Sequence, residues 1–151
     1  MAKVKRPWLK RLLITVLVLI GIGAGIYLYV ALEKHPDTKS EKAAFTVNAI
    51  DFIREFEKDD KAANKKYAEK IITVNGMVSE IEAADTTVNI KFIDTTSGSY
   101  AIFAFQERYI AEAKTLKVGD TASIKGSCSG GILSEILGTE SITFKRCTLN
   151  K

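Results

Sequence analysis

Residues 70–78 read KIITVNGMV, and this stretch decides the fold. From Ile72 to Val78 the apolar residues recur at every second position and alternate with polar ones, with Met77 as the exception. This period of two predicts a strand with one face buried. Gly76 lies inside the pattern, and a glycine within a strand indicates a bulge or a sharp bend. The stretch therefore predicts a strand that bends and could serve two parts of a sheet.

Further elements are predicted on both sides of this strand. Before it, helical spacing of apolar residues begins at Thr46, and Asp59 and Asp60 can cap a second, short helix. After it we expect strands at Thr87–Ile93, Tyr100–Phe105, Thr121–Cys128 and Ser141–Leu149, with a short helix over Gln106–Lys114 between the second and third of these. The segment Ile132–Leu137 is apolar and fits either a hairpin arm or a helical turn.

The order of these elements indicates a fold. Two helices, three meandering strands, an interposed helix and two closing strands follow the plan of a five-stranded OB-fold β-barrel. The predicted fold class is thus an α+β domain with N-terminal helices and a helix between strands 3 and 4. A first strand bent at Gly76 fits this plan, because that strand must pair in both halves of the barrel.

Several short motifs resemble the tRNA_anti-like OB-fold family. They are Ala62-Ala63-Asn64-Lys65-Lys66-Tyr67, the strand 70–78 with its Val-x-Gly-x-Val, Lys125-Gly126-Ser127-Cys128-Ser129-Gly130, and the late Cys147. The resemblance covers about residues 44 to 148 and leaves the apolar N-terminal segment outside. The family name records a likeness to anticodon-binding domains; the resemblance implies a fold and no particular activity or catalytic residues.

The segment Leu12–Leu32 contains no charged residue over 21 positions. That length matches a helix crossing a hydrocarbon core of about 30 Å. A cleaved signal peptide is the main alternative, but its apolar core is usually shorter and ends at a small-x-small site, which is missing here. No cysteine stands directly after the apolar run, which excludes a lipoprotein signal. We therefore expect an uncleaved transmembrane helix that binds the bilayer through residues 12–32.

The net charge of +4 divides unevenly along the chain. Five basic residues and no acidic ones precede the apolar run, which leaves 22 − 5 = 17 basic against 18 acidic residues from Glu33 onward. The basic tail, residues 1–11, is expected to stay in the cytoplasm by the positive-inside rule, with the C-terminal domain extracytoplasmic (periplasmic). The remainder of the chain is close to neutral, which opposes nucleic-acid binding. Residues 33–44 are expected to form a polar linker and 45–151 the OB-fold domain.

Two sets of residues are candidate sites. Cys128 and Cys147 fall on the two closing strands, and an oxidising compartment favours a disulfide between them, with two buried free thiols as the alternative. Asn89, Lys91 and Tyr100 could share the outer face of the second and third strands, where OB folds often bind ligands. One lysine and one aromatic residue are few for a nucleic-acid platform, and a merely solvated sheet face is the alternative interpretation.

The sequence offers no catalytic constellation. Neither carboxylate pair, Asp59–Asp60 or Glu80–Glu82, is marked as buried, and no motif for a metal, a phosphate loop or a cofactor is present. We therefore expect a non-enzymatic, single-pass, membrane-anchored binding or interaction module of the cell envelope. Its partner would be an envelope protein or an oligosaccharide. A nucleic-acid-binding OB domain and a cryptic envelope hydrolase are the alternatives.

Overall fold

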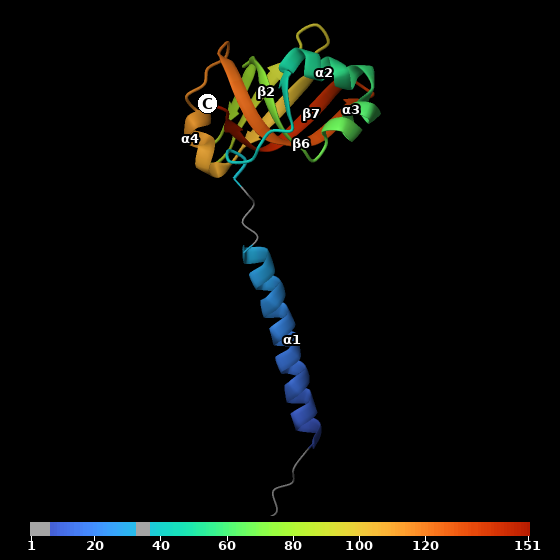
Figure 1. Ribbon diagram of the computed structural model, residues 1–151, viewed down its shortest axis with the longest axis vertical. Helices are drawn as coiled ribbons and strands as arrows, with labels where there is room; N and C mark the ends of the chain where they lie inside the picture. The colour runs from blue at the N-terminus through green and yellow to red at the C-terminus, as the bar shows by residue number, and fades with distance from the viewer. Residues whose placement is uncertain (1–6, 33–36) are drawn as a thin grey trace, which may run out of the picture. The chain divides into compact units, whose positions relative to one another are not determined.

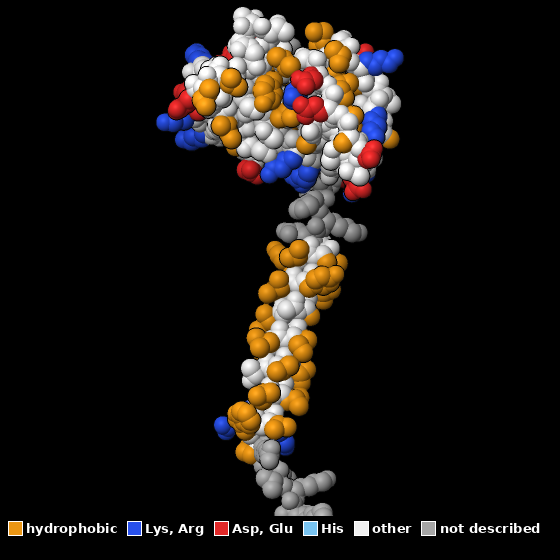
Figure 2. All heavy atoms as spheres, turned by 180° about the vertical axis from the view of Figure 1, so that it is seen from behind, with side chains coloured by type: hydrophobic (Ala, Val, Ile, Leu, Met, Phe, Trp, Pro, Cys, Tyr) orange, Lys and Arg blue, Asp and Glu red, His pale blue; other side chains and the backbone are white. Residues whose placement is uncertain are grey.

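The computed structural model of the chain describes residues 7–32 and 37–151, which fall into two separate units. The first contains one helix, α1 (Pro7–Leu32), and none of its residues is buried. Its 26 residues correspond to about 39 Å, which exceeds the hydrocarbon thickness of a bilayer. Figure 2 shows hydrophobic side chains along it and Lys or Arg side chains at its lower end. Among the described residues, α1 is the one helix long and apolar enough to cross a membrane.

The second unit, from Asp37 to Lys151, is a domain with its own hydrophobic core. Its helices are α2 (Ala49–Lys58), α3 (Asp60–Tyr67), a 3₁₀ turn η1 (Glu107–Tyr109) and α4 (Ile110–Ala113). Its strands are β1 (Phe45–Asn48), β2 (Ile71–Met77), β3 (Glu80–Ala83), β4 (Val88–Ile93), β5 (Tyr100–Phe105), β6 (Thr121–Ser134) and β7 (Thr139–Leu149). Figure 1 shows the sheet curled, with α2 and α3 together on one side and α4 apart from them.

The sheet has seven strands in the order β1-β2-β6-β7-β5-β4-β3, so the prediction of a five-stranded closed barrel is not confirmed. One reason is that the predicted first strand ends at Met77 as β2, and a further short strand, β3, follows after Val78 and Ser79. The amide of Val78 donates to the carbonyl of Asp120, next to β6, and that of Ser79 donates to the carbonyl of Lys91 on β4. The chain therefore changes its pairing partner at this point, as the predicted bend requires.

The second reason is β1, which lies where the sequence predicts the start of a helix. Val47 is in phase with the helical spacing that follows, yet it pairs with Val74 in a short parallel ladder. The helix begins at Ala49, because the side chain of Asn48 caps it by accepting a hydrogen bond from the amide of Ile50 at 3.0 Å. The predicted cap of the next helix is confirmed: the carboxylate of Asp59 accepts from the amide of Ala62.

Gly76 lets α2 approach the sheet closely. A Cβ atom on this residue would lie 2.6 Å from the Cβ of Ala49 and 2.9 Å from the ring of Phe92. The break in the strand itself comes two residues later, at Val78 and Ser79. Gly76 is therefore required by helix-to-sheet packing beside the bend.

The core is a chain of aromatic rings that joins the helices to the sheet. Phe52 of α2 packs against Tyr67 of α3 and Phe144 of β7, with ring centroids 5.0 and 5.7 Å apart. Phe103 of β5 continues the chain, stacked on Phe144 at 4.7 Å. The Tyr67 hydroxyl donates to Glu55 at 2.6 Å, so its polar end is also satisfied.

A long hairpin of β6 and β7 is held to α3 by one side chain. The Asn64 amide nitrogen donates to the carbonyl of Gly131 at 3.0 Å, and its oxygen accepts from the amide of Gly131 at 2.8 Å. Gly130, with φ +102°, takes a backbone conformation that favours glycine. The strand thus continues past Ser129-Gly130-Gly131, and the apolar segment after it begins as a hairpin arm.

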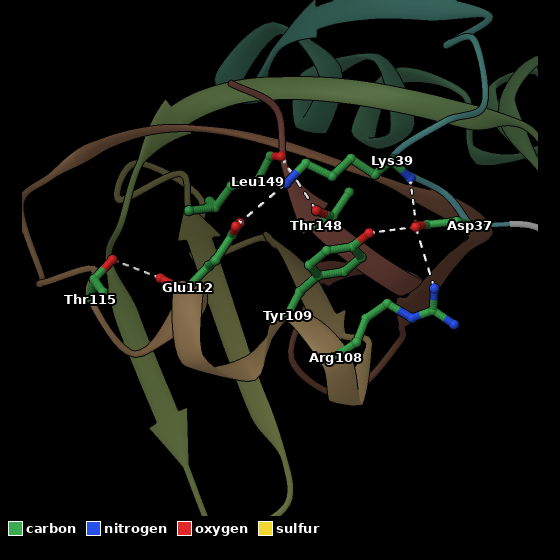
Figure 3. Close-up of polar contacts among 8 residues, drawn as sticks. All are labelled: Asp37, Lys39, Arg108, Tyr109, Glu112, Thr115, Thr148 and Leu149. Carbon is green, nitrogen blue, oxygen red and sulfur yellow. Dashed lines mark hydrogen bonds and ion pairs between the residues drawn. The ribbon is translucent and has the colours of Figure 1, made fainter.

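The first residues of the domain are tied to its surface rather than forming a free linker (Figure 3). The Asp37 carboxylate accepts from the Tyr109 hydroxyl at 2.6 Å and from Arg108 at 3.4 Å. Lys39 forms an ion pair with Glu112 at 3.4 Å. The hydrogen bond from Tyr109 lowers the pKa of Asp37, and the same bond raises the pKa of Tyr109.

Two further contacts fix this segment. The ammonium group of Lys125 donates to the carbonyls of Lys39 and Glu41 at 3.1 and 2.9 Å, and Thr38 is fully buried. Of the predicted linker 33–44, residues 33–36 lie outside the described part of the chain. The remainder belongs to the domain, in agreement with the division of the chain at Asp37.

Candidate functional site

The exposed side of four neighbouring strands forms one continuous surface, which we call the outer face. Burial alternates along β4 and β5, so every second residue points away from the core. The residues of the outer face used below are Lys91 and Ile93 of β4, Tyr100 and Ile102 of β5, Thr143 of β7 and Ile132 of β6. The register aligns them in rows across the sheet: Ile93 pairs with Tyr100, Tyr100 with Ser141, and Ser141 with Ile132.

The one lysine of β4, Lys91, forms ion pairs with two carboxylates of the neighbouring strand. The Lys91 ammonium group lies 2.6 Å from the Glu82 carboxylate and 3.4 Å from that of Glu80, both on β3, and only 16% of its side chain is exposed. The bond with Glu82 raises the pKa of Lys91 and lowers that of Glu82. The same ammonium group lies 5.5 Å from the centre of the Tyr100 ring, within cation–π range. These three charged groups sum to −1, which repels a polyanion.

The apolar part of the outer face ends in an exposed hairpin tip. Ile132 on β6 is 76% exposed, and Ile136 and Leu137 in the turn are 96% and 74% exposed. Exposed aliphatic side chains gathered on one short segment are unusual in a monomeric soluble domain and mark contact surfaces. Figure 2 shows the rear of the domain, where Lys or Arg and Asp or Glu side chains are mixed and hydrophobic ones lie among them.

Cys128 and Cys147 are both fully buried and both free, so the predicted disulfide is not supported. They lie in a region of irregular pairing between β6 and β7, where the register shifts twice. Burial raises the pKa of the Cys128 thiol to about 11 and that of Cys147 well above its usual value. The alternative of two buried thiols therefore describes the structure, and neither thiol is activated for chemistry.

Glu140 is a buried carboxyl group that the sequence did not single out. It is 1% exposed, and neither of its carboxyl oxygens has a hydrogen-bond partner among the described residues. Burial raises its pKa, and the nearby charges of Asp60 and Glu57 raise it further. Among residues 7–32 and 37–151, no group of three or more His, Cys, Asp or Glu side chains could hold a metal ion.

The structure brings together the residues that the sequence proposed for a ligand face. Lys91 and Tyr100 are in contact, and Asn89 lies two residues from Lys91 on the same side of β4, opposite Glu82 of β3. Sequence reasoning missed Ile132 and Ile136. The signal was present in the apolar segment Ile132–Leu137, but the sequence did not distinguish a hairpin arm from a helical turn there.

A family model described as tRNA_anti-like matches residues 1–142. The match includes the apolar N-terminal helix, which the motif resemblance had left outside, and it ends before Cys147. No curated protein matches the chain.

Solved structures with a similar fold are distant in sequence. A candidate nucleic acid-binding lipoprotein from Klebsiella pneumoniae is 17% identical, with a TM-score of 0.55, and the match covers 70% of this chain and 91% of that one. A candidate aspartyl-tRNA synthetase from Leishmania major is 9% identical, with a TM-score of 0.45, over 77% of this chain and 22% of that one. At such identities the likeness shows the fold alone.

Proposed function

The chain belongs to the tRNA_anti-like family, and we propose that it is a membrane-anchored, non-enzymatic module whose outer face binds a protein partner in the cell envelope. In this proposal β2 and β3 together act as the bent first strand of a five-stranded OB barrel, with β1 added beside it. Helix α1 is the anchor. The five basic residues before Leu12 keep the N-terminus in the cytoplasm and the domain outside.

The observation that supports a protein partner is the chemistry of the outer face. Apolar side chains on it include Ile93, Tyr100 and Ile132, with Ser141 between the last two, and the exposed tip adds Ile136. Protein contact surfaces combine such apolar and aromatic anchors with a polar rim. The surplus of negative charge around Lys91 favours a partner segment that carries a basic residue beside its apolar ones.

Nucleic-acid binding is the alternative, supported by the name of the Klebsiella pneumoniae protein, which shares the fold. Single-strand binders on OB folds combine a positively charged groove with several stacked aromatic rings. On β4 and β5 the outer face offers one lysine, already paired with two carboxylates, and one tyrosine, which lies within cation–π range of that lysine. The proposal includes no catalytic step, since no histidine stands near these groups in the described part of the chain.

Full-length protein in a neutral detergent is expected to bind labelled single-stranded DNA weakly through its domain. Ordinary non-specific binders reach dissociation constants of about 10⁻⁴–10⁻⁶ M at physiological salt. Because the N-terminal tail is itself basic, fluorescence anisotropy should be compared between the wild type and Lys91→Ala, and we expect the two curves to coincide. A sub-micromolar isotherm that Lys91→Ala abolishes would favour the nucleic-acid alternative.

A further inference from the structure

A small pocket opens at one end of the outer face, where α2 meets β2 and β4. Its volume is about 160 Å³. Its apolar walls come from three elements: Ile50 of α2, Met77 of β2, and Phe92 and Ile93 of β4. Met77 is 60% exposed, so the pocket is bordered by a side chain that faces solvent.

Two side-chain oxygens of the pocket already accept hydrogen bonds. The Asn48 side chain accepts from the amide of Ile50 at 3.0 Å, and the Ser79 hydroxyl accepts from the amide of Ile93 at 3.1 Å. No charged residue lines the pocket. A ligand group that enters it therefore meets an apolar surface with no free charge to neutralise.

The size of the pocket limits what it can take. Drug-sized ligands and cofactors occupy cavities of about 300–1,000 Å³, which is well above this volume. An apolar cavity of about 150 Å³ is enough for a benzene-sized group. One large side chain, such as that of phenylalanine or leucine, is thus the group that fits.

Ile93 connects the pocket to the outer face. It lines the pocket and pairs directly with Tyr100, in the row that leads through Ser141 to Ile132. We propose that this pocket receives a single large apolar side chain of the protein segment that lies along the outer face, and so anchors one end of that segment. This inference rests on the proposed function and names the anchor that the partner must supply. Such anchors in small pockets carry much of the energy of protein interfaces.

The sequence provides a specific reporter for this pocket. The chain has two methionines: Met77 borders the pocket, and Met1 lies outside the described residues. Full-length protein labelled with ¹³C at the methionine methyl groups, in a lipid nanodisc, therefore gives one pocket signal and one internal reference. The probes are N-acetyl-phenylalaninamide, N-acetyl-leucinamide and, as a control without a side chain, N-acetyl-glycinamide.

The phenylalanine probe is expected to move the Met77 signal saturably, and roughly threefold further than the glycine probe, because an aromatic ring buries far more apolar area. The Met1 signal should stay in place. Ile50→Phe and Ile50→Trp are expected to fill the pocket and to reduce the shift of the Met77 signal, and the larger tryptophan should reduce it more. Lys65→Ala, at an exposed position of α3 outside the pocket lining, should leave the response unchanged.

Two results would overturn this inference: equal shifts with the phenylalanine and glycine probes, or an undiminished response in a folded Ile50 variant. Thermal unfolding of each variant shows whether it is folded. If Ile50→Trp does not fold, the response of Ile50→Phe alone tests the inference. These probes need no natural partner. If the probes do not bind but position-specific cross-linking from the outer face succeeds, the pocket is rejected and the proposed function is retained.

Discussion

Replacing Glu140 by methionine is expected to raise the free energy of unfolding of the domain by about 1–3 kcal/mol at pH 8. The Glu140 side chain is 1% exposed and both its oxygens lack partners among the described residues, so folding removes the carboxyl group from water without replacing its hydrogen bonds. Methionine has a similar length, no charge and an adaptable shape. The carboxyl group lies beside Gly131, since a Cβ atom on that glycine would be 2.6 Å from Glu140 Oε1.

The gain from Glu140→Met should depend on pH. The folded pKa of Glu140 is raised by burial and by the charges of Asp60 and Glu57, while the unfolded chain titrates near the ordinary value. Below about pH 4.3 both states hold the proton and the carboxyl group adds no pH dependence. As the pH rises through the folded pKa, wild-type stability is lost, because the unfolded state releases its proton first.

Denaturant unfolding of the wild type and Glu140→Met at a series of pH values from 4 to 9 checks this prediction. The difference between the two proteins should widen as the pH rises. Glu57→Gln serves as the control, since it removes one neighbouring charge and leaves the buried carboxyl group in place; it should reduce the wild-type decline only in part. Parallel pH profiles for the wild type and Glu140→Met would contradict the account of Glu140.

Replacing Asn64 by alanine is expected to cost about 2–3 kcal/mol of stability. The change removes both hydrogen bonds to Gly131 and leaves a part-buried amide and carbonyl of β6 without partners. The stability of Asn64→Asp should lie between those of the wild type and Asn64→Ala. The aspartate keeps an acceptor for the amide of Gly131 but places a carboxylate against the carbonyl oxygen of Gly131. Denaturant unfolding measures each difference.

The matched control is Lys65→Ala, the next residue on α3, which is exposed. A surface change of this kind is expected to alter stability by no more than about 0.5 kcal/mol. If Asn64→Ala and Lys65→Ala were equally mild, the side chain of Asn64 would not be what holds the β6–β7 hairpin to α3. The exposed tip of that hairpin, with Ile136, would then need another support.

The regular strands were predictable because their periodicity is local. Tyr100–Phe105 is confirmed at both ends, and Val88–Ile93 within one residue. The length of β6 was not predictable, since a sequence such as Ser129-Gly130-Gly131 is typical of the end of a strand. It stays in the ladder because Asn64, about 67 residues earlier in the chain, completes the hydrogen bonds of Gly131.

The start of the domain shows the same limit. Asp37 and its neighbours are polar and follow an apolar helix, which is typical of a linker. They are held by Tyr109 and Lys125, more than 70 residues further along the chain, and no local pattern indicates such contacts. The short β1 was missed for a related reason: Val47 fits the helical spacing, and pairing with Val74 overrides it.

For the candidate site, the sequence predicted which side chains of β4 and β5 share a face, but not the electrostatics of that face. Lys91 and Tyr100 were expected on one face, and they are in contact. That Glu80 and Glu82 neutralise Lys91 depends on the register between β3 and β4, which the sequence does not specify. The pairing gives the group of Lys91, Glu80 and Glu82 a net charge of −1.

Cross-linking from the outer face measures whether this face contacts a protein on the outside of the membrane, as we propose. The native thiols of Cys128 and Cys147 are buried and their pKa values are raised, so a cysteine introduced at an exposed position should react alone. Thr143→Cys places it on the outer face, beside Ile102, and Asp51→Cys places it on the exposed side of α2.

Spheroplasts of a bacterial host that express each variant would be labelled with a membrane-impermeant, thiol-reactive photo-cross-linker and illuminated. We expect both variants to be labelled. Only Thr143→Cys should give a larger cross-linked product, and this product should resist nuclease. Adding Ile132→Asp should reduce the amount of the product. A nuclease-sensitive product, an identical product from Asp51→Cys, or no labelling of either variant unless the membrane is permeabilised would contradict the proposed function.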